Sequence, residues 1–286
     1  MTAELAPAQS ALWAVIGDAA SRLEAAGVTS ARHDAEEMAA TCLGVRRARL
    51  HAAPFFTSEQ FAAFSALVAR RELREPLQHI LGTAPFRHLE LAVGPGVFIP
   101  RPETEVLVEA VLAVTGQAAL VVDLCAGSGA IALSIAHERP DTVVHAVERD
   151  AAAFAWLSRN AASTGGIVSL HLADAADALA SLDGKVDVVA SNPPYLPDGL
   201  TLSPEVAAFD PAPALWGGAD GLDMVRVVSR SAARLLRPGG FVAIEHDDSH
   251  GVAAPALLSA TGHWKQIEDH DDLTGRPRFV TARRAG

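Results

Sequence analysis

Asn192 to Tyr195 follow the apolar run VDVVA directly and form a stretch, Asn-Pro-Pro-Tyr, whose residue types suit a specific chemistry. Proline cannot donate to a strand ladder and pushes the preceding residue into extended geometry, so we expect a strand to end with Asn192 at its tip. Taken alone, the stretch also fits an ordinary proline turn that leaves a strand. The question is what a rigidly held amide side chain does at that position.

Two hydrogen-bond acceptors at this tip would suit methyl transfer to a planar amide or amino nitrogen. The Asn192 side-chain oxygen and the Pro193 carbonyl could accept from the N–H groups of such a nitrogen, which is a poor nucleophile because its lone pair is delocalised. They would orient it and stabilise the positive charge that develops as the methyl arrives. Tyr195 is expected to stack on the planar group and face the sulfonium of the donor.

A glycine-rich turn precedes this stretch in the sequence, in VVDLCAGSGAIALSIA. Gly127 and Gly129 would let the backbone approach a ligand closely, and the N–H groups of the following helix favour something polar or anionic there. Asp123 ends a buried strand, where a carboxylate is costly without a partner such as a cofactor ammonium or the loop amides. Because GSGAIA also satisfies the dinucleotide fingerprint, a nicotinamide enzyme is an alternative at this point.

Two further carboxylates close the next strands. Glu148, in HAVERD, could accept hydrogen bonds from ribose hydroxyls, which supports a nucleoside-containing cofactor without choosing which one; it could equally be a surface glutamate that opens a helix. Asp174, in HLADAAD, stands where an adenine amino group could be met, although a helix N-cap is at least as good an interpretation. The Asn-Pro-Pro-Tyr stretch favours methyl transfer over hydride transfer.

The elements that must position these residues follow from periodicity. Residues 9–75 predict three helices, and residues 76–100 predict one or two short strands linking two domains. The remaining sequence alternates between strand-like and helix-like runs, which predicts an α/β fold with a mostly parallel sheet covered on both faces and ligands at the carboxyl ends of the strands. Strands are expected at 119–124, 142–148, 168–173, 186–190 and 240–246, and helices at 103–114, 129–138, 150–162 and 222–236.

Composition narrows the class of protein. The chain of 286 residues is 50% hydrophobic, which is ample for a packed core, and it contains no run of about 18 apolar residues and no recognisable export signal, so we expect a cytoplasmic protein. Its two cysteines are expected to be reduced thiols. Residues 91–286 carry 14 Lys and Arg against 24 Asp and Glu, a net charge of −10 of the total −11, which counts against nucleic acid as the main ligand.

With these motifs in view, the sequence from about Pro76 to the C-terminus resembles the bacterial release-factor glutamine methyltransferases. That family transfers a methyl group from S-adenosylmethionine to the glutamine side-chain amide in the Gly-Gly-Gln motif of class 1 peptide chain release factors. DxxxGxG and NPPY recur in many methyltransferases, whereas FIPRPETE joined to NPPY is much more specific. The resemblance rests on PLQHILG, FIPRPETE, DLCAGSGAIAL, SNPPYLP, GGADGLDMVRVV, LRPGGFVAIE and DLTGRPRFV.

The resemblance implies a Rossmann-like class I methyltransferase domain with a seven-stranded sheet whose last strand, RFVTA, inserts antiparallel. It implies domains at 1–75 (helical, docking the protein substrate), 76–100 (a β-hairpin linker) and 101–286 (the methyltransferase), with S-adenosylmethionine as donor, S-adenosylhomocysteine as product and no metal. The implied cofactor-binding residues are Asp123, Cys125, Ala126, Gly127, Ser128, Gly129, Glu148, Asp174, Ala175 and Asn192. The implied substrate-binding residues are Asn192, Pro193, Pro194, Tyr195, Phe98 and Arg101, with Asn192, Pro193 and Tyr195 as the catalytic groups.

Three positions depart from the family pattern. Cys125 replaces a glycine of DLGTGSG, Ala175 is smaller than the usual residue at the adenine edge, and 246–248 read His-Asp-Asp where glycine and glutamine usually follow Ile244 and Glu245. No role is assigned to that last segment. The departures bear on how the loop packs and how tightly the donor binds.

Several alternatives remain open. The nearest is the sibling enzyme that methylates a glutamine of a ribosomal protein, although RPETE favours the release-factor branch. A DNA or RNA adenine methyltransferase would have to flip its target base, and this sequence has no evident target-recognition domain or basic surface. A binding module on a degenerate methyltransferase fold is the non-enzymatic alternative. The expected partner is a class 1 release factor, with no direct contact to nucleic acid or membrane, and the protein is expected to be a monomer.

Overall fold

The computed structural model describes residues 7–165 and 167–286 of the protein. Residues 1–6, which begin the predicted helical domain, lie outside the described residues. The chain divides into two compact units. The helical unit comprises the described part of Met1–Gly82 together with Ser203–Phe209, and the sheet unit comprises Thr83–Leu202 and Asp210–Gly286.

The helical unit consists of amphipathic helices around a small apolar core, as the sequence predicts. Its helix ends follow local rules: α2 ends at Gly44, which has a left-handed φ of +67°, and α3 begins with a capping box between Thr57 and Gln60. The cap is therefore Thr57, directly before Ser58, the first residue of the helix. The elements are α1 (Pro7–Ala25), α2 (Ala31–Leu43), η1 (Arg47–Ala52), α3 (Ser58–Glu72), α4 (Leu77–Leu81) and α8 (Pro204–Phe209).

The sheet unit opens with an antiparallel hairpin, β1 (Thr83–Phe86) and β2 (Leu89–Ala92), and is built on a seven-stranded sheet in the order β5-β4-β3-β6-β7-β9-β8. Strands β3 to β7 are parallel, whereas β9 pairs antiparallel with both β7 and β8. The mostly parallel sheet and the antiparallel insertion of RFVTA are thus confirmed. The strands are β3 (Leu120–Leu124), β4 (Val143–Glu148), β5 (Val168–Leu172), β6 (Val186–Ser191), β7 (Leu236–Glu245), β8 (Trp264–Asp271) and β9 (Pro277–Arg284).

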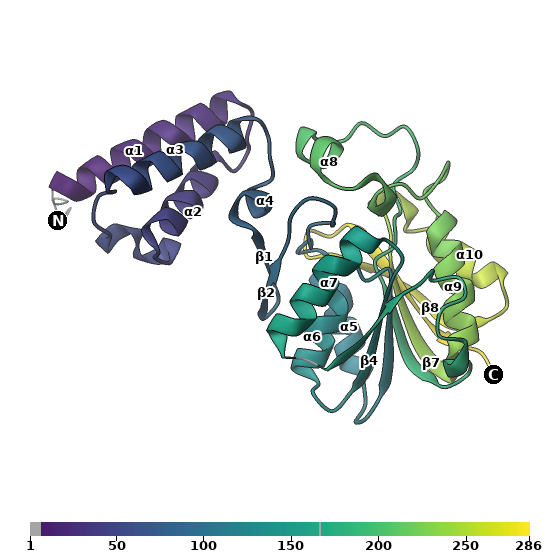
Figure 1. Cartoon of the computed structure of the whole chain (residues 1–286). Helices are drawn as coiled ribbons and strands as arrows, with labels where there is room; N and C mark the ends of the chain where they lie inside the picture. Colours follow the sequence, from purple (N-terminus) through teal and green to yellow (C-terminus); the bar gives the residue numbers. More distant parts are fainter. Residues whose placement is uncertain (1–6, 166) are drawn as a thin grey trace. The chain divides into compact units, whose positions relative to one another are not determined.

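Helices cover both faces of the sheet (Figure 1). The apolar side chains of α5, α6 and α7 pack in one cluster with Val121, Val188 and Phe279. The side chains of α9 and α10 pack in a second cluster with Val122, Val189 and neighbouring sheet residues. Alternate strand residues therefore serve opposite faces. These helices are α5 (Thr104–Val114), α6 (Ala130–Glu138), α7 (Ala151–Thr164), α9 (Asp223–Leu235) and α10 (Ala253–Ala260).

Two strands differ from the sequence prediction, and helices α4, α8 and α10 were not predicted. Strand β7 begins at Leu236 rather than at residue 240, and a register irregularity lies opposite this start, between Val186 and Val188 of β6. Strand β8, which was not predicted, is an edge strand of polar sequence, WKQIEDHD, so it lacks the apolar run that marks the central strands. No helix among the described residues is long and apolar enough to cross a membrane.

Candidate active site

The parallel strands β3, β4, β6 and β7 end at one edge of the sheet, and the candidate residues follow these ends. Glu148 is the last residue of β4, Glu245 is the last residue of β7, and Asn192 follows β6 directly. The Ser191 hydroxyl at the end of β6 donates to the Leu124 carbonyl at the end of β3, at 2.6 Å, which joins the two strand tips. The predicted edge is therefore where these side chains gather.

The turn from β3 to α6 has two glycines that meet different requirements. Gly129 has a left-handed φ of +90°, and a Cβ there would approach side-chain atoms of Leu157 and Leu133 to 2.7 and 2.8 Å, so the backbone and the packing both favour glycine. A Cβ on Gly127 would meet nothing within 4 Å, although its φ of +56° also favours glycine. The space beside Gly127 is thus open on the side where a ligand could approach the backbone.

Asp123 is fully buried and only half satisfied. Its Oδ2 accepts from the Ala132 amide of α6 at 3.1 Å, whereas Oδ1 has no hydrogen-bond partner among the described residues. Burial raises the pKa of Asp123 well above its ordinary value, and the nearby Glu148 carboxylate adds to the shift. The observed partner is therefore an amide of α6 and not one of the loop amides that the sequence analysis suggested, and the second oxygen retains the capacity to accept from a cationic donor.

Glu148 holds the glycine turn in place. Its Oε2 accepts from the Gly127 amide and its Oε1 from the Asp150 amide, both at 2.8 Å, and its side chain is largely buried. A carboxylate has about four acceptor sites, so two remain for hydroxyls of a ligand. The alternative of a solvated surface glutamate does not describe this residue.

The segment after β5 contributes a more exposed carboxylate. Asp174 accepts from the Ala176 amide at 2.9 Å, and its other oxygen lies 3.9 Å from Arg149, with about half of each side chain exposed. Asp174 therefore caps a turn and not a helix, because residues 175–179 form turns and η2 (Ala180–Leu182) begins later. Ala175 beside it is buried in the apolar cluster that contains Leu124 and Val147.

Asn192 is anchored on one side of its amide. Its Nδ2 donates to the Thr104 hydroxyl oxygen at 3.1 Å. Thr104 is buried at the start of α5, within the FIPRPETE motif. Because the amide nitrogen is engaged, the Asn192 Oδ1 is the group left to accept from a ligand. Pro193 and Pro194 are buried, which restricts movement of the Asn192 backbone.

Tyr195 is tied to a residue that the sequence analysis left without a role. The Tyr195 hydroxyl donates to Oε1 of Glu245 at 3.0 Å, and Glu245 is almost completely buried. Burial and the Glu245 carboxylate raise the pKa of Tyr195 well above its ordinary value, so Tyr195 is a neutral hydrogen-bond donor. The place of Glu245 at the carboxyl end of a predicted strand was the sequence signal that could have identified it.

The GGADGLD motif packs against the backbone of the Asn-Pro-Pro-Tyr turn. The Leu196 amide donates to the Leu215 carbonyl, and the Gly217 amide donates to the Leu196 carbonyl, each at 2.9 Å. A Cβ on Gly217 would approach the Pro194 carbonyl oxygen to 2.9 Å, and a Cβ on Gly221 would approach that of Tyr195 to 2.4 Å. These glycines permit two backbone segments to touch, which explains why the motif accompanies Asn-Pro-Pro-Tyr.

Phe98 and Arg101 form a separate pair. The Arg101 guanidinium lies over the Phe98 ring at 4.8 Å from its centroid and donates to Oδ2 of the buried Asp210 at 2.6 Å. Among the described residues no hydrogen bond joins either side chain to Asn192. Both residues precede Thr104 in the FIPRPETE motif, so they are close to the site in the sequence. Their direct role at the site remains a prediction.

Taken together, the anchored Asn192, the neutral Tyr195 and the open glycine turn suit a methyl donor and a planar amide acceptor. Asp123 could receive an ammonium, the turn from Cys125 to Gly129 a methionine moiety, and Glu148 ribose hydroxyls. The unsatisfied Oδ1 of Asp123 and the open space at Gly127 are the observations that fit such a donor. Among the described residues no group of three or more His, Cys, Asp or Glu side chains is arranged to hold a metal ion.

Two family models match the chain: the PrmC N-terminal domain over residues 14–82 and the methyltransferase small domain over residues 90–208. The solved T. thermophilus 16S rRNA N2 G1207 methyltransferase, in complex with AdoMet and guanosine, shares 23% identity and a TM-score of 0.51 with this chain. The similarity covers 71% of this chain and 49% of that chain, and it concerns the fold alone.

Curated relatives extend the match to nearly the whole sequence. The release factor glutamine methyltransferase of Streptomyces coelicolor is 50% identical over 280 residues, which are 96% of this chain and 98% of the relative. The protein of the same name from Mycolicibacterium smegmatis is 50% identical over 267 residues, 93% of this chain and 95% of the relative. This chain therefore belongs to the release factor glutamine methyltransferase family.

Proposed function

We propose that this enzyme transfers a methyl group from S-adenosylmethionine to the side-chain amide nitrogen of the glutamine in the Gly-Gly-Gln motif of class 1 release factors. The observation that carries the proposal is the anchored amide of Asn192, whose Nδ2 donates to Thr104 and whose Oδ1 is left to accept. The relatives named above act, by their names, on a release factor glutamine. Asn192 provides the group that would recognise such an amide.

The donor would be held by residues at the ends of β3, β4 and β5. Asp123 would bind the ammonium through its unsatisfied Oδ1, Glu148 would accept from the ribose hydroxyls, and Asp174 with Ala175 would border the adenine. Cys125, Ala126, Gly127, Ser128 and Gly129 would line the methionine moiety. When bound, the donor supplies an electrophilic methyl group attached to a sulfonium.

The acceptor would be oriented by Asn192, Pro193 and Tyr195. The two N–H groups of the substrate amide would donate to the Asn192 Oδ1 and the Pro193 carbonyl, so that the nitrogen lone pair points at the methyl carbon. The nitrogen–carbon bond forms as the sulfur–carbon bond breaks, and the extra amide proton leaves to water. Pre-positioned acceptors stabilise the positive charge on nitrogen in the transition state.

The same arrangement would discriminate against glutamate. A carboxylate has no N–H to offer, so two acceptors would face its oxygens without a hydrogen bond and at an electrostatic cost. Pro194 would stiffen the turn, and Phe98 with Arg101 would wall the site near the transferred methyl. The helical domain, residues 1–75, would dock the protein substrate, with residues 76–100 as the linker to the methyltransferase domain, 101–286.

The proposal is tested by incubating the protein with labelled S-adenosylmethionine and one of four acceptors: a class 1 release factor, its Gly-Gly-Ala variant, a ribosomal protein with an accessible glutamine, or an adenine-containing oligonucleotide. We expect label only in the intact release factor. Label in the Gly-Gly-Ala variant, or preferential label in the ribosomal protein or the oligonucleotide, would overturn the proposed substrate.

Asn192→Ala supplies the residue-level test. We expect kcat with the release factor to fall by about 100-fold or more, because the oriented acceptor is lost, while the Kd of the donor stays within about twofold. The measurement pairs methylation kinetics with calorimetric titration of S-adenosylmethionine. Equal losses in donor affinity and in rate would contradict the assignment of Asn192 to the acceptor amide.

A further inference from the structure

The orientation of the Asn192 amide depends on the hydroxyl of Thr104. An amide side chain can turn by 180°, which exchanges its oxygen for its nitrogen, and only one orientation presents an acceptor to a substrate N–H. The observed contact has Asn192 Nδ2 donating to Thr104 Oγ1 at 3.1 Å. A threonine hydroxyl can also donate, so Thr104 by itself would tolerate either orientation.

Glu245 removes that ambiguity. It is 1% exposed, its Oε1 accepts from the Tyr195 hydroxyl at 3.0 Å, and its Oε2 has no hydrogen-bond partner among the described residues. The Thr104 hydroxyl lies beside this carboxyl and interacts favourably with its ionised form. A buried carboxylate is an acceptor only, so it draws the Thr104 proton and leaves the Thr104 oxygen to accept from Asn192.

We propose that Glu245, acting through the Thr104 hydroxyl, is the positioning residue that fixes Asn192 with its oxygen toward the substrate amide. The inference rests on the proposed function, because it assigns a role in aligning the same acceptor site. Glu245 touches neither substrate nor donor in this scheme. Its effect on Asn192 is carried by the Thr104 hydroxyl at the start of α5, while its hydrogen bond with the Tyr195 hydroxyl ties the turn after β6 to the end of β7.

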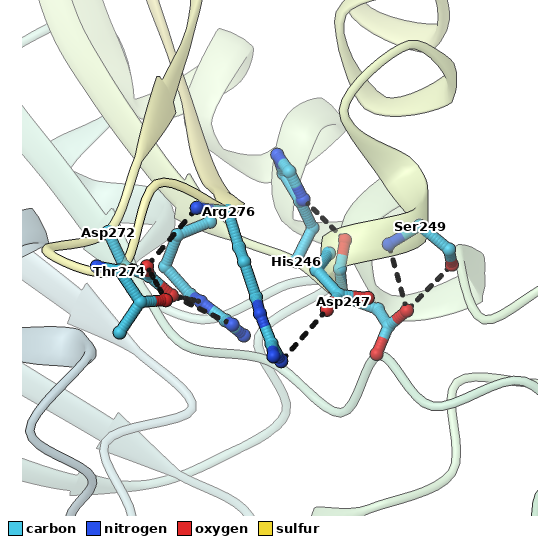
Figure 2. Close-up of polar contacts among 8 residues, drawn as sticks. His246, Asp247, Ser249, Asp272, Thr274 and Arg276 are labelled. Atoms are coloured by element: carbon cyan, nitrogen blue, oxygen red, sulfur yellow. Dashed lines mark hydrogen bonds and ion pairs between the residues drawn. The ribbon is translucent and has the colours of Figure 1, made fainter.

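Charged and hydroxyl groups from three other segments influence the ionisation of Glu245. Arg278 of β9 favours the carboxylate and Glu103 before α5 disfavours it, while the Tyr195 and Thr104 hydroxyls favour it. Arg278 is itself held by Asp272, whose Oδ2 accepts from Arg278 Nη2 at 3.1 Å. Figure 2 shows Asp272 in its turn, where Oδ1 also accepts from the Thr274 amide and hydroxyl. The cation near Glu245 is thus anchored from the β8–β9 loop.

Burial outweighs these favourable contacts and raises the pKa of Glu245 to about 7. Above that pH, the carboxylate enforces the productive orientation of Asn192. Below it, the protonated carboxyl can donate to Thr104, which then becomes free to donate to Asn192 Oδ1 and to stabilise the reversed amide. The reversed amide presents N–H groups to the N–H groups of the substrate. Activity should therefore rise with pH through Glu245 ionisation.

The test measures kcat with a release factor between about pH 5.5 and 8.5, a range that spans the raised pKa of Glu245. The wild type is compared with Glu245→Gln, Thr104→Val and Thr104→Ser. We expect wild-type kcat at one pH unit below the midpoint to be about a tenth of its plateau. Glu245→Gln should lower kcat at pH 8 by about tenfold or more and abolish this acidic limb. Thr104→Val should also lower kcat, and Thr104→Ser should restore most of it.

Asp269→Asn is the matched control, since it removes a carboxylate that interacts with His246, the neighbour of Glu245, without contacting Asn192. It should keep the wild-type pH profile. All variants should bind the donor within about twofold of the wild type, which also shows that they are folded. An acidic limb that persists in Glu245→Gln, or full activity in Thr104→Val, would overturn the role of Glu245. A wild type that fails to label the release factor at any pH would instead overturn the proposed function.

Discussion

Cys125 has a φ of +64°, in the left-handed region that glycine reaches without strain and that costs another residue about 1–2 kcal/mol. The resembling family usually has glycine at this position, so the chain keeps the backbone geometry of the loop although it has lost the residue best suited to it. Burial also raises the pKa of the Cys125 thiol to about 12, which keeps it protonated and unreactive. Cys125 therefore adds strain to a turn whose backbone conformation favours glycine.

Asp123 illustrates a residue whose stability cost is linked to its proposed role. Its folded-state pKa is raised well above the ordinary 3.8, so the folded protein holds this proton more tightly than the unfolded chain does. The stability contributed by that proton is present at low pH and is lost as pH rises from about 4 toward the raised value. Without donor, Asp123→Asn should therefore gain stability relative to the wild type as pH increases, as measured by urea unfolding at pH 4.5 and pH 8.

The same variant should bind S-adenosylmethionine about tenfold or more weakly, because an uncharged amide replaces the carboxylate expected to face the ammonium. Isothermal titration at pH 8 provides this measurement. Unchanged donor affinity in Asp123→Asn would remove Asp123 from the donor site, whatever the unfolding data show.

At the scale of elements, the site depends on how closely the 217–221 segment packs against the turn after β6. Gly221 has a φ of +73°, and a Cβ added there would lie 2.4 Å from the Tyr195 carbonyl oxygen. Real Cβ atoms do not approach so closely, so any side chain at this position must push the Asn-Pro-Pro-Tyr backbone. An element that contributes none of the candidate site residues thus controls where the Asn192 amide lies.

Gly221→Ala should lower kcat with the release factor by about tenfold or more while leaving the Kd of S-adenosylmethionine within about threefold. Gly239→Ala is the control, because Gly239 has a similar φ of +78° but nothing within 4 Å of an added Cβ. It should cost about 1 kcal/mol of stability from backbone strain and leave kcat near the wild-type value. Equal losses of kcat in the two variants would attribute the effect to strain alone.

At the scale of the whole molecule, the chain is divided between a helical unit and a sheet unit, and α8 shows that the division is not sequential. Glu205 of α8 accepts from Arg71 at 3.1 Å and from Arg74 at 2.7 and 2.6 Å. Arg71 also donates to Asp34 at 2.8 Å, and the Arg71 and Asp34 side chains are only 7% and 3% exposed. The segment that follows the Asn-Pro-Pro-Tyr turn therefore supplies an integral part of the helical unit.

Asp34→Asn should destabilise the helical unit by about 3 kcal/mol, because Arg71 would keep its buried charge but lose an ionic partner. In Asp34→Asn, amide hydrogen exchange should be faster than in the wild type for α2 and α3, and unchanged for β3 and β4. Glu72→Gln offers a matched comparison, since Glu72 pairs with Arg22 at the surface, where side chains are 29% and 45% exposed, and such pairs contribute about 0–1 kcal/mol. Similar losses in both variants would contradict a special contribution from the buried pair.

The sequence by itself determined the order of the elements and the ends of the strands that carry Glu148 and Asn192, because these depend on local rules. Prolines stop β6 after Ser191, glycines form the turn after β3, and apolar periodicity marks the central strands and their helices. These rules did not predict β8 or the early start of β7. The polar sequence of the edge strand β8 and the register irregularity beside the start of β7 leave no clear periodic signal.

Only the tertiary structure decided which side chains support the candidate site. Thr104 contacts Asn192 across 88 residues, and Glu245 contacts Tyr195 across 50. These pairings depend on the packing of α5 against the sheet and on the place of β7 beside β6, which no local pattern specifies. The sequence could therefore identify Asn192 as the chemical group, while its orienting partners became visible only when distant segments met in the fold.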